Sequence, residues 1–132
     1  MTLPLGPFFS PRSIPETAES LIGILYDYAP KIADRYRAEL VAKKSKVGLV
    51  YLLLKRLGRY APPFAYVGPH PTNESQLGVW IDLGKLHAAE EKGVLIQAMD
   101  DTVKTKARYV LVLGHHVVLY HRKNWERVWE VE

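Results

Sequence analysis

The stretch that decides the fold is ARYVLVLGHHVVLYHR, residues 107–122. Two runs rich in Val, Leu and Tyr flank Gly114 and His115, which is a pattern typical of two strands joined by a tight turn. Glycine at the first of two turn positions favours a type II′ turn. The sequence therefore predicts a β-hairpin that joins Ala107–Leu113 to His116–Arg122.

The register of this hairpin assigns its side chains to two faces, because a two-residue turn places Leu113 opposite His116. One face then combines Tyr109, Leu111 and Leu113 with His116, Val118 and Tyr120. The other combines Val110 and Val112 with Val117, Leu119 and His121. Both faces are apolar, which indicates that the two strands lie at the centre of a sheet.

Further elements are predicted on both sides of the hairpin. Residues 125–132 form a third, half-exposed strand, which makes a meander. Before the hairpin, residues 78–83 are expected as a strand, residues 85–92 as a short helix closed by Gly93, and residues 94–99 as a strand. These three elements predict a small β-α-β unit.

The first half of the chain has helical periodicity. Ser13 and Glu16 form a capping-box pattern, which predicts a helix from there to about Tyr28. A second helix is expected over Lys31–Lys43, after the break at Pro30. A third is expected from Lys46 to about Tyr60. Its apolar positions cover well over half of its circumference, which predicts burial at the centre of the helical layer.

Prolines mark the remaining segments. Four of them lie within residues 1–15, so residues 1–12 are expected to form an extended arm in a groove of the same chain or of a neighbouring subunit. Residues 61–77 are expected as a connecting loop. The fold class is therefore α+β: a single domain over residues 1–132, with about three N-terminal helices (13–60) packed on a mainly antiparallel sheet that ends in a β-meander (78–132).

Composition narrows the classes of protein. The chain has no cysteine, so disulfides and thiolate metal sites are excluded. It shows no membrane-spanning run and no signal-peptide pattern, so we expect a cytoplasmic protein without membrane partners. Asn73, Gln76, Gln97 and Asn124 are its only side-chain amides, a depletion that indicates a thermophilic source.

Positive charge is concentrated in one segment. Residues 31–59 carry nine basic and two acidic residues, whereas residues 60–132 carry eight basic and nine acidic ones. A basic helical surface attracts phosphate backbones, although a merely solvated surface is the alternative. The predicted nucleic-acid-binding residues are Arg37, Lys43, Lys44, Lys46, Lys55, Arg56 and Arg59.

Residues 39–59, ELVAKKSKVGLVYLLLKRLGR, resemble the second and third helices of helix-turn-helix transcription regulators over about a sixth of the chain. The resemblance implies a third helix in the major groove, with Lys46, Lys55, Arg56 and Arg59 at phosphates or bases. The chain departs from that pattern in two ways. It lacks the turn glycine, and it has Leu49, Leu52 and Leu53 where a reading helix needs polar side chains. A buried helix with basic ends is the alternative.

Catalytic patterns are weak. Five histidines invite a metal hypothesis, but His116 and His121 are predicted on opposite faces of one strand, so we expect no metal site. Acid pairs occur at Glu90 with Glu91 and at Asp100 with Asp101. The second pair follows a predicted strand, but the acidic-x-lysine triplet that metal-dependent nucleases carry on the next strand is absent. With no phosphate-binding glycine loop or nucleophile elbow, we expect neither an enzyme nor a cofactor.

Two functions follow. The first is a small non-enzymatic DNA- or RNA-binding protein whose basic helical surface contacts mainly phosphates. The second is a structural or protein-interaction module, of viral or mobile-element origin, that forms homo-oligomers or binds a protein partner. Its contacts would be the arm and the aromatic edge strand, through Phe8, Phe9, Trp125 and Trp129.

Overall fold

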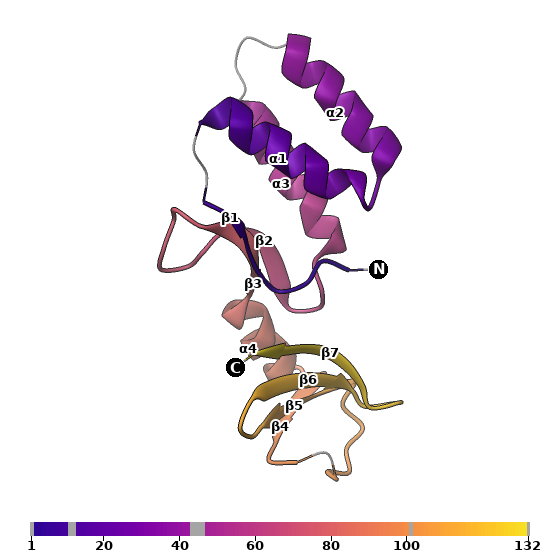
Figure 1. The fold of residues 1–132 in the computed structure, drawn as a ribbon. Coiled ribbons are helices and arrows are strands. Elements are labelled where there is room, and N and C mark those ends of the chain that lie inside the picture. The colour runs from indigo at the N-terminus through magenta and orange to yellow at the C-terminus, as the bar shows by residue number, and fades with distance from the viewer. Residues whose placement is uncertain (1, 11–12, 43–46, 101, 132) are drawn as a thin grey trace. The chain divides into compact units, whose positions relative to one another are not determined.

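The chain has the α+β class that the sequence predicts, with N-terminal helices followed by strands (Figure 1). The computed structural model describes residues 2–10, 13–42, 47–100 and 102–131. The chain divides into two compact units, which we describe separately. The helical unit comprises Met1–Ala61 and Tyr66–Trp80, and the meander unit comprises Pro62–Ala65 and Ile81–Glu132. The single domain over residues 1–132 stays a prediction.

The helical unit contains three helices and a small sheet. Its elements are β1 (Gly6–Phe9), α1 (Ile14–Tyr26), α2 (Pro30–Ala42), α3 (Val47–Leu57), the 3-10 turn η1 (Gly58–Tyr60), β2 (Ala65–Pro69) and β3 (Leu77–Ile81). The capping box at the start of α1 is confirmed, because Ser13 Oγ accepts from Glu16 N at 3.2 Å and donates to Glu16 Oε1 at 3.0 Å. All three helices begin and end within a few residues of the predicted bounds.

The central helix of this unit is α1. It packs against both α2 and α3, which contact each other far less. Leu21, Ile22 and Leu25 of α1 are fully buried, as are Leu53 and Leu57 of α3. The predicted burial of α3 on most of its circumference is therefore wrong: α3 packs along one side only, and its opposite side is exposed.

The N-terminal arm pairs with its own chain. Leu3 is buried and its N–H donates to Tyr60 O at 2.7 Å. β1 then pairs antiparallel with β3. Pro7 is tolerated because β1 is an edge strand of the β1-β3-β2 sheet. A Cβ on Gly78 would lie 2.7 Å from Pro7 Cα, so the close approach of β1 to β3 at this pair requires glycine.

The predicted loop over residues 61–77 is corrected by the structure, because β2 occupies Ala65–Pro69. Its sequence, AYVGP, includes β-favouring Tyr66 and Val67 beside Gly68 and Pro69. As in β1, an edge position accepts the proline. Proline therefore argues against a central strand but not against an edge strand, and β2 is an edge strand.

The meander unit contains one helix and a four-stranded sheet. Its elements are α4 (Leu83–Glu91), β4 (Leu95–Ala98), β5 (Tyr109–Leu113), β6 (Val117–His121) and β7 (Glu126–Val131), in the strand order β4-β5-β6-β7. The three-strand meander is confirmed, and β5 and β6 are central as predicted. The β-α-β unit is wrong, since β3 and β4 lie in different sheets and the parallel partner of β4 is β5.

The hairpin register differs from the prediction by one residue. Leu113 pairs with Val117, and Tyr109 with His121, so the turn has three residues, Gly114–His116. A type II′ turn requires a positive φ angle at the position of Gly114, and the φ angle of Gly114 is not positive. This one-residue shift places Tyr109, Leu111 and Leu113 on the same face as Val117, Leu119 and His121 instead of the predicted set.

Residues 62–65 pack on the meander unit and form hydrogen bonds with it. Pro63 O accepts the indole N–H of Trp129 at 2.8 Å, and Phe64 O accepts from Asp82 N at 2.8 Å. The Phe64 ring contacts Tyr109 edge-on at 5.0 Å between centroids. Phe64 has a φ of 64°, a left-handed conformation rare for a bulky residue. This short segment therefore belongs to the core of the meander unit.

Candidate nucleic-acid interface

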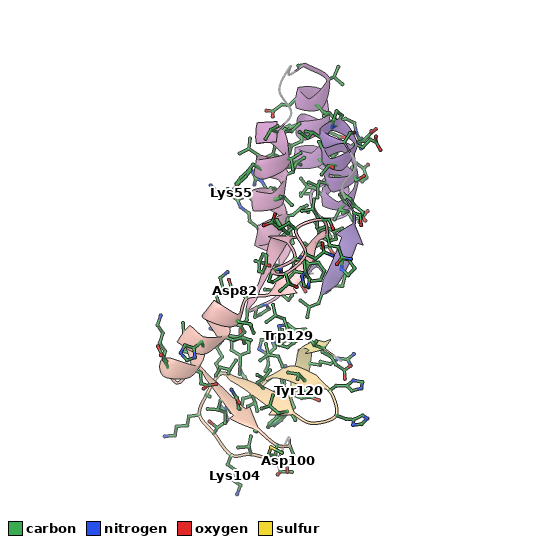
Figure 2. The ribbon with its side chains drawn as sticks, turned by 90° about the vertical axis from the view of Figure 1, so that its left-hand side faces the viewer. Lys55, Asp82, Asp100, Lys104, Tyr120 and Trp129 are labelled. Atoms are coloured by element: carbon green, nitrogen blue, oxygen red, sulfur yellow. The ribbon has the colours of Figure 1, made fainter. Side chains whose placement is uncertain are left out.

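The exposed side of α3 is the best-defined part of the predicted basic surface. Val47, Tyr51 and Lys55 recur at four-residue spacing, so they lie along one side of the helix. Lys55 is exposed, and Figure 2 shows its side chain directed away from α1 and α2. Arg59 follows four residues later in η1 and is also exposed. We call Val47, Tyr51, Leu52, Lys55 and Arg59 the α3 surface.

The other predicted nucleic-acid-binding residues occupy different places. Arg37 lies on α2, where its guanidinium is 3.6 Å from Asp34 Oδ1 in an exposed ion pair. Arg56 is half-buried at the end of α3. Lys43, Lys44 and Lys46 lie outside the described residues. Lys55 and Arg59 are therefore exposed cations four residues apart, at the end of α3 and in η1, and Arg37 is partly neutralised on α2.

Tyr51 is a candidate binding residue that the sequence alone did not single out. Its side chain is 78% exposed, far more than a core tyrosine would be. An exposed aromatic ring beside cations supplies a stacking face for a nucleic-acid base. The available signal was its spacing: Tyr51 is two positions from the buried Leu49 and Leu53 and so falls on another side of the helix.

Electrostatics favour an anion at the α3 surface. The sequence has no Asp or Glu between Glu39 and Glu74, so no carboxylate close in sequence neutralises Lys55 and Arg59. Lys55 and Arg56 also lie in the last turn of α3, where the partial negative charge of the helix end stabilises cations. The surface can therefore present fixed positive charge to a phosphate.

The exposed side of α3 does not suit reading of base edges. Leu49 and Leu53 face the core, and the outward positions are Val47, Tyr51 and Leu52 with a single cation, Lys55. Specific recognition in the major groove needs side chains such as Arg, Asn or Gln that hydrogen-bond to base edges. The chemistry available on α3 is stacking and phosphate contact.

The four predicted protein-interaction residues are not gathered on one surface. Trp129 is 6% exposed and donates its indole N–H to Pro63 O, so its proposed role as a surface contact is wrong. Trp125 is half-buried against Tyr120, with ring centroids 5.7 Å apart. Phe8 and Phe9 are half-buried in the paired strand β1, and Phe9 lines a hollow of about 320 Å³ beside α1.

The histidines do not gather at one place, although His115 and His116 stack with ring centroids 5.9 Å apart. His116 Nδ1 lies 3.0 Å from Glu130 Oε1, and His87 Nε2 lies 3.1 Å from Glu91 Oε1. His70 packs on Trp80, and His121 on Tyr109. Within the described ranges, no three His, Asp or Glu side chains converge as metal ligands would.

Of the predicted acid pair at 100–101, only Asp100 is described. Its Oδ1 accepts from the N–H of Thr102 at 2.9 Å and from its hydroxyl at 2.6 Å. The side-chain bond and then the backbone bond lower the pKa of Asp100 from its usual 3.8. The Asp100 carboxylate therefore stabilises the turn in which it lies, through its two hydrogen bonds with Thr102.

Comparisons with known proteins give no relative: no family model, no curated protein and no solved structure matches this chain. In the described part of the chain, no helix combines the length and the apolar character needed to cross a membrane.

Proposed function

We propose that this chain is a non-enzymatic, cytoplasmic protein that binds single-stranded nucleic acid, DNA or RNA, through the α3 surface. Lys55 and Arg59 contact phosphates, and Tyr51 stacks on a base. The observation that carries this proposal is the 78% exposure of Tyr51 on the same side of α3 as Lys55. Because every base has a stacking face, such binding tolerates many sequences.

The first test is fluorescence anisotropy of a labelled 12-nucleotide single strand with the variant Lys55→Glu/Arg59→Glu. Each lost phosphate contact reduces the salt slope by about 0.7, so two losses weaken binding roughly 60-fold at ~50 mM salt. Lys31→Glu/Arg35→Glu is the matched control, because it reverses the same charge at two exposed positions of α2. Equal weakening by both variants would show a general charge effect and contradict the proposal.

The second test separates stacking from charge. Tyr51→Ala removes the ring and should weaken binding by about 1–3 kcal/mol with an unchanged salt slope. Tyr51→Phe retains the ring and should bind as the wild type does. Equal affinity of Tyr51→Ala and Tyr51→Phe would remove stacking from the proposal.

A protein-interaction module remains the second candidate. The sequence suggests it from the arm and the edge strand, whereas the structure supports it through exposed apolar residues on α3. Val47 is 55% exposed and Leu52 44% exposed beside Tyr51, and exposed apolar groups of this kind mark protein contacts. Sedimentation of the wild type and of Leu52→Ser, without nucleic acid, tests this function. Self-association that Leu52→Ser abolishes would favour it, and a monomer at all concentrations would exclude the homo-oligomer.

A further inference from the structure

Half of the basic residues after Tyr60 surround one hollow in the meander unit. The hollow has a volume of about 490 Å³. It is lined by Lys106, Arg108, His121, Arg122, Lys123, Asn124 and Glu126. Four cations therefore face a single carboxylate, in a part of the chain whose total charge is close to neutral. We call this site the meander hollow.

Strand pairing assembles these cations from two segments. Tyr109 pairs with His121, and one step outward Arg122 N donates to Arg108 O at 3.1 Å. The two arginines therefore stand opposite each other, an arrangement of like charges that destabilises a hairpin. None of the four cations forms an ion pair with a carboxylate in the described ranges. A bound anion would relieve this repulsion.

The turn that carries Lys123 is held in place by its own contacts. Asn124 Oδ1 accepts from Glu126 N at 3.0 Å, and Asn124 Nδ2 donates to Glu126 Oε2 at 3.1 Å. Trp125 adopts a φ of 54°, in the left-handed region that bulky residues rarely occupy, and its ring contacts Tyr120. The Glu126 carboxylate is thus engaged by Asn124, and the backbone next to Lys123 is fixed before any ligand arrives.

Arg108 also has a defined support. Its guanidinium carbon lies 5.7 Å from the centre of the Tyr109 ring, within the range of a cation–π contact. That ring in turn contacts the rings of Phe64 and His121, with centroids 5.0 and 5.1 Å away. An arginine with a constrained position is suited to bidentate contact with a phosphate.

We propose that the meander hollow binds phosphate groups, separately from the α3 surface and beyond the function proposed above. Arg108 and Arg122 supply forked N–H donors, and Lys106 and Lys123 supply point charges. Every lining residue is polar or charged, which suits a highly charged anion better than a ligand with a large apolar body. The phosphates belong either to a nucleic-acid backbone or to a free compound such as a nucleoside triphosphate.

The experiment titrates inorganic triphosphate into the full-length chain and follows amide chemical shifts by NMR. We expect the largest changes at residues 122–126, and Lys106→Glu/Lys123→Glu should weaken binding by at least about tenfold. Lys85→Glu/Lys92→Glu reverses the same charge in the same unit but away from the hollow, and should stay within about twofold of the wild type. If the first variant does not fold, Lys123→Gln removes one charge without reversing it.

Absence of shift changes at residues 122–126, or equal weakening by both double variants, would overturn the site. Competition by a 12-nucleotide single strand and by adenosine triphosphate then identifies the source of the phosphates. Both competitors are compared at equal concentration of phosphate groups. If the oligonucleotide displaces triphosphate at a lower concentration than adenosine triphosphate does, the phosphates belong to a nucleic-acid backbone. If adenosine triphosphate is the stronger competitor, they belong to a free compound. Lys55→Glu/Arg59→Glu should leave triphosphate binding unchanged, so failure at α3 and failure at the hollow are seen separately.

Discussion

The α3 surface and the meander hollow are both basic, but their chemistry differs. The α3 surface lies on α3 and the following turn η1, and it mixes Lys55 and Arg59 with exposed Tyr51, Val47 and Leu52. The meander hollow collects four cations from two chain segments, and each residue that lines it has a polar or charged side chain. We propose contacts to a base and to phosphates at the first, and contacts to phosphates at the second. Two basic sites of one chain therefore favour different kinds of contact.

The largest expected effect that separates the two sites comes from Trp129→Ala. Replacing a buried tryptophan with alanine costs about 3–5 kcal/mol of unfolding free energy, and this one also loses its hydrogen bond to Pro63. Because β7 and the turn before it depend on this packing, triphosphate binding should be lost. Binding of the single-stranded oligonucleotide at the α3 surface should persist. Urea denaturation followed by the two titrations tests this, and loss of both activities would contradict separate sites.

Gly78→Ala perturbs the other unit. Its Cβ would meet Pro7 Cα at 2.7 Å and the carbonyl oxygen of Gly6 even more closely, so β1 must move. Crowding of this kind typically costs about 1–3 kcal/mol. Gly23→Ala in α1 is the control: its Cβ meets nothing within 4 Å, so it should stabilise the helix by about 0.5–1 kcal/mol. Urea denaturation should show opposite signs, and triphosphate binding should be unchanged in both variants.

The smallest effects come from the two helix caps, one in each unit. Ser13 caps α1 and Asp82 caps α4, each by accepting from a backbone N–H three residues later. Ser13→Ala and Asp82→Ala should each cost about 1 kcal/mol. Hydrogen exchange should show faster opening of the helical unit in the first variant and of the meander unit in the second. A uniform change over both units in either variant would show that they unfold together.

Local patterns predicted most of the elements. The capping box at Ser13, the helix that it begins and the apolar hairpin all form as expected. The register of the hairpin did not follow, because Gly114 lacks the positive φ that the two-residue turn needs. Edge strands β1 and β2 were missed because their prolines are harmless only at an edge, and edge position is a property of the assembled sheet.

The candidate sites were predictable to different degrees. Lys55 and Arg59 lie in the basic segment, so counting charge along the chain was enough to select them. That count averages Arg108 and Arg122 with acidic residues far from them in the fold, which hides the meander hollow. Pairing the hairpin residue by residue would have placed basic residues opposite each other at its open end in either register.

The four residues Pro62–Ala65 belong to the meander unit although the residues on both sides belong to the helical unit. A single proteolytic cut after Trp80 would therefore leave Pro62–Ala65 on the fragment that carries the helical unit. During synthesis, β1 must wait for β3, about 70 residues later, before it can pair. The arm is synthesised long before its partner strand, so its apolar residues stay unpaired until β3 is available.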